Sequence, residues 1–332
     1  MISPRFAVVW ILLIAPQLAA AQEPHILKQD GWIAAVVFSP DSKTFASAGA
    51  DNVVRLWEVG TWKSKGALKG HGDCVCTVAF SKDGDWLACG SFDHTGKMWD
   101  MQKQQAVHDF SYPNDSRRKR GGAILTTAIH PSKEILACAG VDSLIVLHDI
   151  RLDPNKSADI VLPGHKSWVN SVAFNRDGNL LASGSSDATV RLWKLAPAMS
   201  TIPLKEQTIL EGGAGEVRCV AFSPDSKILA AGNRYGTVRV WDVGSRKEVK
   251  TLAGHASDVW AIAFSPDGKT LAAADTDWKK PSKIKLWDTT TWKERGSLPC
   301  PGEILCLAYS PKGDWLAAGS WDKTVRLFAL QR

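Results

Sequence analysis

The segment VAFNRDGNLLASGSSDATVRLWKL, at residues 172–195, is one of seven related copies in this chain of 332 residues. In each copy, one residue ends the first apolar run and another residue ends the third apolar run. These two positions are 19 residues apart, as Phe174 and Trp193 are, except in the sixth copy, where the interval is 23. The other six copies stand at residues 36–59, 78–101, 127–150, 220–243, 262–289 and 307–330. A fixed period of this kind is typical of a repeat architecture, in which each copy is one structural unit.

Each copy has the pattern of short β-strands separated by turns. The apolar run at 217–222 ends at Ser-Pro-Asp-Ser, whose proline suits a tight turn, and a run rich in β-branched residues follows at 238–243. The first runs are apolar at both alternating positions, so both faces of these strands must be covered. No segment keeps a helical period over about ten residues, which excludes a helical solenoid. The sequence therefore predicts an all-β fold of four-stranded sheets stacked radially, like blades, around an axis.

The repeats resemble those of WD40 proteins, and residues 25–332 as a whole are similar to a seven-bladed WD40 β-propeller. Gly-His pairs stand at residues 70–71, 164–165 and 254–255, and Trp-Asp pairs at 99–100, 241–242 and 287–288. The resemblance implies that an N-terminal strand, here residues 25–28, completes the last blade and closes the ring. Closure removes open sheet edges, and we predict a single propeller domain over residues 22–332.

Residues 1–21 have the features of a secretory signal peptide. Arg5 precedes an apolar run of about ten residues, half of what a bilayer span requires, and Ala19-Ala20-Ala21 offers a small-residue cleavage site. We expect cleavage after Ala21, export to the periplasm or the extracellular space, and no membrane insertion of the mature chain. The net charge of +6 is spread along the chain rather than gathered in a stripe, so we expect no nucleic-acid partner.

The resemblance also implies a structural network within a blade, made by the Gly-His histidine, a Ser or Thr of the second strand, the turn Asp and the third-strand Trp. Blade two has Cys89 for the Ser, and blade five has Tyr235 for the Asp. A His, a Ser and an Asp could form a hydrolase triad, but in the family this group satisfies buried polar atoms away from any cleft. We therefore assign it to stability. Blade four alone has all four residue types, as His165, Ser183, Asp187 and Trp193.

The segments that begin the first strands and the turns between second and third strands should emerge on one face of the ring. The chain has 15 Trp against 10 Phe and 3 Tyr, and five Trp that mark no repeat position fall on this face. Large apolar side chains are costly to leave in water, and Trp and Arg are enriched at binding hot spots. The predicted partner-binding residues are Trp32, Phe92, Trp168, Glu216, Arg218, Arg234, Asp258, Trp260, Trp278, Glu303 and Trp321.

Two functions stay open on this basis. The leading hypothesis is a noncatalytic scaffold or recognition module that binds a protein or peptide on this face, as a monomeric ring within a larger assembly. The alternative is a metal-binding or enzymatic propeller that uses Glu216, Asp258 and Glu303, which occupy one slot in three consecutive blades and could begin a calcium site. The sequence contains no P-loop, dinucleotide-binding glycine pattern or nucleophile elbow. We therefore expect no cofactor, no catalytic residue and no metal under the leading hypothesis.

Overall fold

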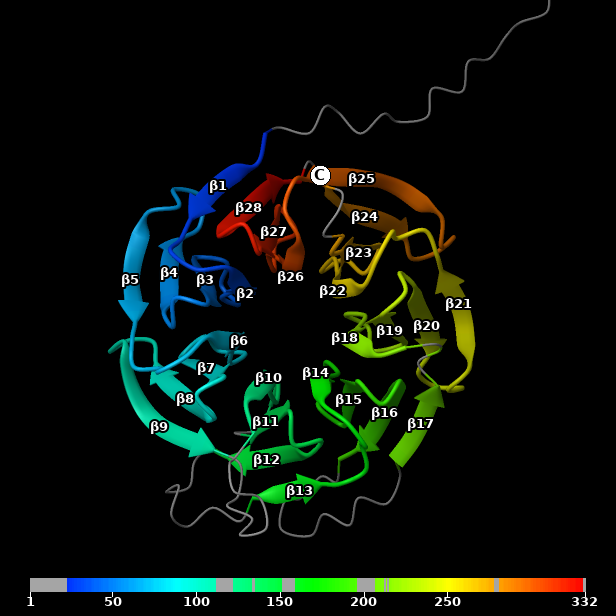
Figure 1. Cartoon of the computed structure of the whole chain (residues 1–332), viewed down its shortest axis with the longest axis horizontal. Helices are drawn as coiled ribbons and strands as arrows, with labels where there is room; N and C mark the ends of the chain where they lie inside the picture. Colours follow the sequence, from blue (N-terminus) through cyan, green and yellow to red (C-terminus); the bar gives the residue numbers. More distant parts are fainter. Residues whose placement is uncertain are drawn as a thin grey trace, which may run out of the picture.

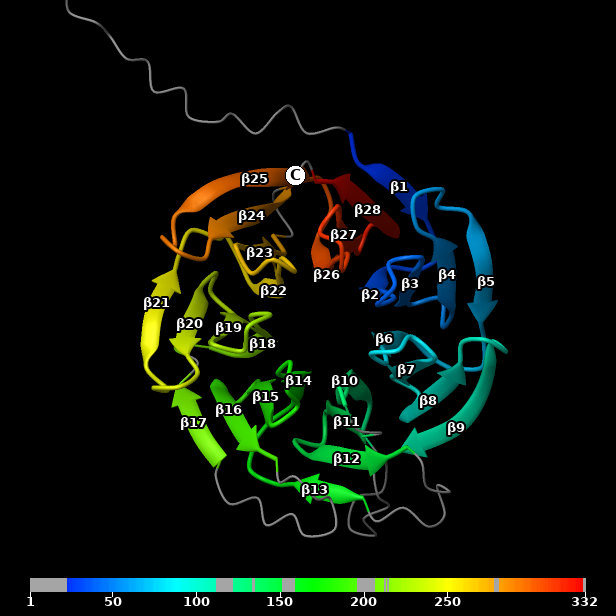
Figure 2. The same ribbon diagram turned by 180° about the vertical axis from the view of Figure 1, so that it is seen from behind.

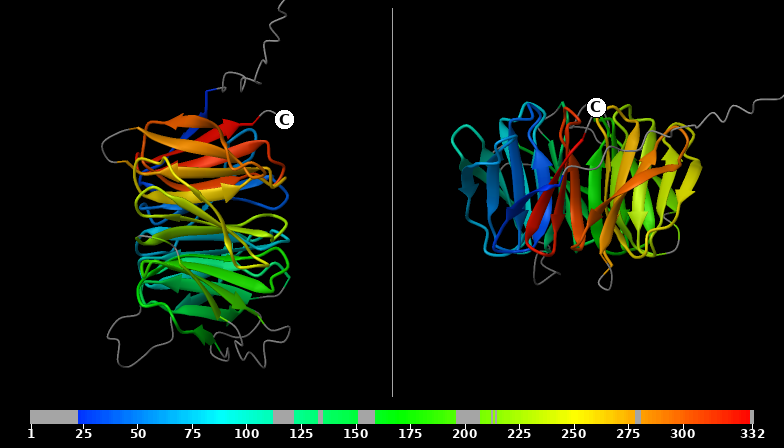
Figure 3. Two further views of the ribbon diagram at one scale, coloured as in Figure 1. Left: turned by 90° about the vertical axis from the view of Figure 1, so that its right-hand side faces the viewer. Right: turned by 90° about the horizontal axis from the view of Figure 1, so that it is seen from above.

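The fold is a ring of seven β-sheets. The computed structural model describes residues 23–111, 122–132, 135–150, 159–195, 207–211, 213, 215–277 and 281–330. Its regular structure within these ranges consists of 28 β-strands in seven four-stranded sheets. Figures 1 and 2 show the sheets as blades around a common axis, and Figure 3 shows the ring edge-on as a disc. The predicted all-β, seven-bladed propeller is confirmed.

Every blade has the same strand order from the axis to the rim, as Figure 1 shows. The innermost strands are β2 (Ile33–Phe38), β6 (Val75–Phe80), β10 (Ile124–Ile129), β14 (Val169–Phe174), β18 (Val217–Phe222), β22 (Val259–Phe264) and β26 (Ile304–Tyr309). The second strands are β3 (Thr44–Gly49), β7 (Trp86–Ser91), β11 (Ile135–Gly140), β15 (Leu180–Ser185), β19 (Ile228–Asn233), β23 (Thr270–Asp275) and β27 (Trp315–Ser320). The third strands are β4 (Val54–Glu58), β8 (Thr95–Asp100), β12 (Ile145–Asp149), β16 (Thr189–Lys194), β20 (Val238–Asp242), β24 (Ser282–Asp288) and β28 (Thr324–Ala329). The outermost strands are β5 (Ser64–Leu68), β9 (Gln105–Ser111), β13 (Ile160–Leu162), β17 (Gln207–Glu211), β21 (Glu248–Leu252), β25 (Glu294–Cys300) and, in blade seven, β1 (His25–Lys28).

The hydrophobic core lies between the blades. Each of seven buried clusters joins side chains of two neighbouring blades, as Val190 of blade four joins Leu229 of blade five. The second strand β11 is buried along its whole length, because a blade lies against each of its faces. Burying a Val or Leu side chain fully contributes about 1.5–3 kcal/mol. No blade can obtain this burial alone, so the blades depend on their neighbours in the ring.

Blade seven is completed by the N-terminal strand. β1 pairs antiparallel with β28, with His25 opposite Leu327 and Lys28 opposite Thr324. The first and last strands of the chain therefore lie side by side at the seam with blade one (Figure 1). The sequence-based prediction of ring closure by residues 25–28 is confirmed.

Two sequence-based expectations fall on residues outside the described ranges. These are the signal peptide at residues 1–21 and the partner-binding role of Trp278. Among the residues that the structure does describe, no helix has the length and apolar character needed to cross a membrane.

Candidate functional site

One edge of the disc, which we call the top edge, is built from the segments before the innermost strands and the turns after the second strands. In all seven blades one backbone hydrogen bond joins these two segments, between residues 18 positions apart. The N–H donors and carbonyl acceptors are Ala50 to Trp32, Phe92 to Cys74, Val141 to Ala123, Ser186 to Trp168, Arg234 to Glu216, Thr276 to Asp258 and Trp321 to Glu303. Eight of the predicted partner-binding residues belong to these pairs, so the structure brings them to one edge.

A β-bulge lies next to each of these pairs. In blade five Val217 pairs with Asn233 and Cys219 with Gly232, which leaves Arg218 as the extra residue. A bulge re-aims the side chain of the extra residue and strengthens the local twist. The equivalent residues of the seven blades are Ala34, Cys76, Leu125, Asn170, Arg218, Trp260 and Leu305. Arg218 and Trp260, the remaining described candidates, therefore lie at bulges of the top edge.

Arg218 connects the charged residues of blades five and six. Its Nη1 lies 2.7 Å from Glu216 Oε2, and its Nη2 lies 3.1 Å from Asp258 Oδ2. Its guanidinium carbon also stands 4.6 Å from the centre of the Trp260 ring, which is a cation–π distance. Two carboxylates and an aromatic ring thus hold one guanidinium, and this part of the top edge is preorganised.

The same network continues towards blade four. Arg234 Nη1 lies 3.0 Å from Glu216 Oε1, and the Ser186 hydroxyl donates to Glu216 Oε2 at 3.1 Å. Asn170 Nδ2 donates to Ser186 Oγ at 2.9 Å and to the Val217 carbonyl oxygen at 2.8 Å. A single connected set of polar side chains therefore crosses the top edge of three consecutive blades.

The three carboxylates of the metal hypothesis do not converge as a set. Glu216 and Asp258 both pair with Arg218, which offsets their charge. Glu303 belongs to blade seven, where its carbonyl oxygen accepts the Trp321 N–H. Within the described ranges no three His, Cys, Asp or Glu side chains gather in a group that could hold a metal ion. Arg218 thus already occupies two of the three carboxylates that the metal hypothesis requires.

The aromatic residues of the top edge differ in how much surface they offer. Trp32 and Trp321 stack on each other across the seam between blades seven and one, with ring centroids 4.8 Å apart and an interplanar angle of 13°. Each ring therefore covers one face of the other. Trp168 of blade four is 53% exposed, and Phe92 of blade two is 38% exposed. Trp168 is the best-exposed tryptophan anchor among the described candidates.

Tyr235 is an aromatic residue of this edge that sequence reasoning missed. It is 67% exposed, and the Arg234 guanidinium carbon lies 5.7 Å from its ring centre. The sequence pattern showed Tyr235 only as a departure from the turn Asp of the repeat. That departure was the available signal, because an aromatic in an exposed turn has no structural role in the repeat.

In blade four the four residues of the structural network are joined end to end. His165 Nδ1 lies 2.9 Å from Asp187 Oδ2, and His165 Nε2 lies 2.7 Å from Ser183 Oγ. Burial lowers the pKa of His165, although the hydrogen bond with Asp187 opposes this, so the ring is neutral at pH 7. Since a carboxylate only accepts, Nδ1 carries the proton, and Nε2 accepts the Ser183 hydroxyl. Ser183 Oγ in turn accepts from Trp193 Nε1 at 2.9 Å.

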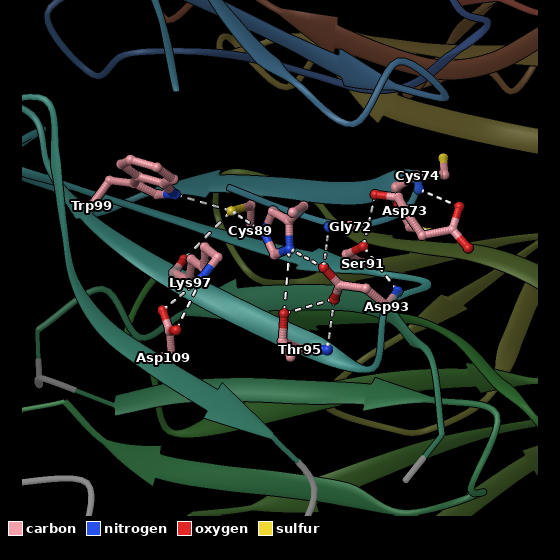
Figure 4. A network of polar contacts seen from close by, with 12 residues as sticks. Gly72, Asp73, Cys74, Cys89, Ser91, Asp93, Thr95, Lys97, Trp99 and Asp109 are labelled. Atoms are coloured by element: carbon pink, nitrogen blue, oxygen red, sulfur yellow. Dashed lines mark hydrogen bonds and ion pairs between the residues drawn. The ribbon is translucent and has the colours of Figure 1, made fainter. Parts of the chain in front are cut away.

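Blade two forms the same network with a thiol in place of the hydroxyl (Figure 4). Trp99 Nε1 donates to Cys89 Sγ at 3.2 Å, and His71 Nε2 lies 3.1 Å from the same sulfur. His71 Nδ1 lies 2.9 Å from Asp93 Oδ2. Burial raises the pKa of Cys89 to about 12, so the sulfur stays protonated. Cys89 thus takes the place of the network's hydroxyl, as its position in the repeat indicated. All seven cysteines of the chain are free.

Blade six has the histidine and the Trp of the network but not the hydroxyl, and its His255 Nδ1 lies 3.3 Å from Asp275 Oδ2 at the end of β23. Ala273 pairs with Ile262 and Lys285, which is the register position of Ser183 in blade four. Within the part of the chain that the structure describes, His255 Nε2 and Trp287 Nε1 are consequently buried with no hydrogen-bond partner. Buried polar atoms in native proteins are nearly always paired, so blade six carries two unsatisfied atoms that one hydroxyl would satisfy.

Replacing Ala273 with serine is expected to raise the free energy of unfolding by about 1 kcal/mol. The new hydroxyl would donate to His255 Nε2 and accept from Trp287 Nε1, as Ser183 does in blade four. Urea unfolding at pH 7 measures the change. The matched control is Ala274→Ser, which buries a hydroxyl at the next position of β23 and is expected to destabilise the ring. Equal losses for both variants would contradict the prediction.

These repeated features define the class of protein, and the chain belongs to the WD40-repeat β-propeller family. A family model described as "IFT122 first beta-propeller" matches residues 123–332. A second model, "WD domain, G-beta repeat", matches residues 21–58 and 62–100. Together they cover blades from both halves of the ring.

Several curated proteins are similar to this chain over about half of its length. Periodic tryptophan protein 2 of Arabidopsis thaliana is 28% identical over 54% of this chain and 19% of its own length. Small ribosomal subunit protein RACK1y of Oryza sativa subsp. japonica is 27% identical over 50% of this chain and 48% of its own. Ribosome biogenesis protein YTM1 of Yarrowia lipolytica is 31% identical over 47% of this chain and 32% of its own. The matches thus span half or less of these relatives.

Proposed function

We propose that this chain is an exported, noncatalytic recognition module that binds a protein or a peptide through its top edge. The observation that carries the proposal is Trp168, which is 53% exposed at the top edge of blade four. It lies beside the polar network that begins at Asn170 of the same blade. An exposed aromatic next to preorganised polar groups is the arrangement of a binding hot spot.

In this proposal the partner contacts two kinds of surface. Trp168 and Trp260 supply apolar area, while Glu216, Asp258 and Glu303 supply carboxylates for a basic group. Because Arg218 already offsets Glu216 and Asp258, the charged part of the surface acts mainly in orientation and specificity rather than in raw affinity. The stacked pair of Trp32 and Trp321 contributes its exposed outer faces.

The names of the relatives support a protein partner. They include a small ribosomal subunit protein, a ribosome biogenesis protein and a target of rapamycin complex subunit of Schizosaccharomyces pombe. These names describe components of assemblies. We infer by analogy that this chain also works as a monomeric ring within a larger assembly. The spread of its net charge of +6 along the chain favours no nucleic-acid partner, and we expect no membrane insertion after the signal is cleaved.

Export rests on the sequence of the first 21 residues. An apolar run of about ten residues after Arg5, followed by Ala19-Ala20-Ala21, fits a cleaved secretory signal. In this proposal the mature ring begins at Gln22 and meets its partner in the periplasm or outside the cell.

Replacing Trp168 and Trp260 with alanine is expected to weaken partner capture by about thirtyfold or more, since truncating a hot-spot residue costs roughly 2 kcal/mol or more. The measurement is affinity capture with tagged chain recovered from the envelope or the culture medium, where Gln22 should be its first residue. Both variants should keep the unfolding midpoint of the parent, because the two rings lie at the edge and not between blades.

The matched control is Ile209→Ala, which truncates a side chain 52% exposed on the outermost strand β17. It removes a similarly exposed apolar group away from the top edge and should leave capture unchanged. Unchanged capture by the two Trp variants would overturn the assignment of the binding face.

A further inference from the structure

At the edge opposite the top edge, which we call the bottom edge, the turn after the third strand of blades one, two and six reaches the boundary with the preceding blade, which we call a notch. One residue enters the notch from the turn after the third strand, five positions after the Trp that marks that strand. In blades one, two, five and six this residue has the same left-handed backbone conformation. The residues and φ angles are Trp62 (57°), Gln104 (53°), Arg246 (60°) and Trp292 (54°).

In blade one the tryptophan fills its notch. Trp62 is only 7% exposed and lies edge-on to Trp315 of blade seven, with ring centroids 5.0 Å apart. It also stacks with His25 of β1 at 6.0 Å. Trp292 packs similarly with the apolar cluster shared by blades five and six. An indole at this position therefore seals the gap between two blades.

Blade two has Gln104 where these blades have an indole, and its notch is open. Gln104 Nε2 donates to the Lys65 carbonyl oxygen at 3.4 Å, and its Oε1 lies 2.5 Å from the place that a Cβ on Gly66 would take. The amide thus lies along β5 of blade one. A pocket of about 240 Å³ remains between blades one and two, and Leu56, Phe80 and Met101 line it.

The same pocket is lined by three carboxylates and one ammonium group. Asp41 stands in the first turn of blade one, and Asp83 and Asp85 stand in the equivalent turn of blade two. Lys65, the one cation of the lining, donates to Thr44 Oγ1 at 2.8 Å. Asp41 Oδ1 accepts from Ser39, and Asp83 Oδ1 accepts from Ser81. In this described part of the chain the Oδ2 atoms of Asp41 and Asp83 receive no hydrogen bond.

Asp41 and Asp83 are ionised at neutral pH. Burial by itself would raise the pKa of Asp41, but its hydrogen bonds with Ser39 and the Lys43 N–H outweigh burial and lower it. The Ser81 hydroxyl likewise lowers the pKa of Asp83. The pocket therefore combines an apolar wall with excess negative charge, the complement of a cation on an apolar stem.

We propose that this interblade pocket binds the side chain of an arginine from a protein partner. A volume of about 240 Å³ is below the roughly 300–1,000 Å³ of pockets for drug-sized ligands and suits a single side chain. The planar guanidinium has five donors for the carboxylates and a flat face for Phe80, and its stem can lie on Met101. This site is on the opposite edge from the proposed partner-binding face and does not depend on it.

The test uses the chain labelled with ¹³C in its methionine methyl groups. The chain has four Met, of which Met101 lines the pocket and Met98 is buried in the core of blade two. Titration with N-acetyl-arginine methylamide should shift the Met101 resonance in a saturable way and leave Met98 unmoved. The citrulline analogue, which has the same shape without the charge, should bind about tenfold more weakly.

Two variants test separately the volume of the pocket and the negative charge of its lining. Gln104→Trp places an indole in the notch and should abolish the saturable shift. Asp85→Asn should weaken binding about tenfold while leaving the pocket open, because Asp85 contributes charge to the lining. The matched control, Asp177→Asn, changes the residue of blade four equivalent to Asp83 and should leave the titration unchanged.

Three results would overturn the proposal. They are a Met101 shift that persists in Gln104→Trp, equal binding of the arginine and citrulline analogues, and equal binding of arginine and lysine analogues. Trp168→Ala should leave the titration unchanged, so failure of the top edge and failure of this pocket are distinguished.

Discussion

Replacing Trp62 with alanine is expected to lower the free energy of unfolding by about 3–5 kcal/mol, the range for truncating a buried Trp or Phe. Trp62 lies at the seam where the ring closes. Its indole contacts Trp315 of blade seven edge-on, and it stacks with His25 of the closing strand β1. Truncation opens a cavity between blade one and blade seven and removes contacts from both. Urea unfolding followed by circular dichroism at pH 7 measures the loss.

A double-mutant cycle with Trp315→Ala isolates the contact between the two rings. An aromatic pair contributes about 0.5–1.5 kcal/mol beyond the area that it buries. The double variant should therefore lose less free energy of unfolding than the sum of the two single-variant losses, by about that amount. Trp292→Ala provides the comparison at the equivalent position of blade six, where the indole is only half-buried and the loss should be smaller. A loss below about 1 kcal/mol for Trp62→Ala would contradict the role of this residue in the seam.

Replacing Asp187 with alanine is expected to lower the free energy of unfolding by about 3 kcal/mol. Asp187 accepts hydrogen bonds from His165 Nδ1, from the Lys166 N–H and from the Thr189 hydroxyl. Removing the carboxylate leaves the buried His165 N–H without an acceptor and releases the turn after β15. The matched control is Asp177→Ala, which removes an exposed carboxylate from another turn of blade four and should change stability by less than about 0.5 kcal/mol.

The pH dependence gives a second readout of the same prediction. Burial by itself would raise the pKa of Asp187, but its hydrogen bonds outweigh burial and lower it from 3.8 to about 2. As the pH falls, the Asp187 carboxylate therefore takes up its proton at a higher pH in the unfolded state than in the folded state. Its contribution to the free energy of unfolding is complete above pH 3.8 and disappears as the pH falls towards 2. The parent should lose stability in this window more steeply than Asp187→Ala. Parallel profiles would contradict the assignment.

The fold was predictable from the sequence because its determinants are local. Apolar runs covered on both faces recur at a fixed spacing and are followed by polar turns, and each copy therefore specifies the same four-stranded unit. The closing strand was predictable too, since residues 25–28 match the outermost strand that blade seven needs. The top edge was predictable from the same pattern. Successive strands of a blade run in opposite directions, so the position of a residue in the repeat determines which end of the blade it reaches.

The contacts within the site were less predictable, because they join residues of different blades. The carboxylates of Glu216 and Asp258 looked like a set of ligands, yet the structure places Arg218 between them. Trp32 and Trp321 stand near opposite ends of the chain and stack on each other only because the ring closes. The repeat pattern placed Cys89 where other blades have a hydroxyl, but its contacts with His71 and Trp99 depend on the orientation of those two side chains.

The sequence by itself determined the number of blades, the order of their strands and the edge that carries the surplus aromatic residues. Periodicity and turn chemistry are properties of neighbouring residues, and they act before any blade meets another. Only the tertiary structure decided which side chains pair across blades, which hydroxyl is missing beside His255 and Trp287, and which notch stays open at Gln104. Those contacts depend on how closely the surfaces of two neighbouring blades, each determined by its own repeat, fit together once the ring is closed.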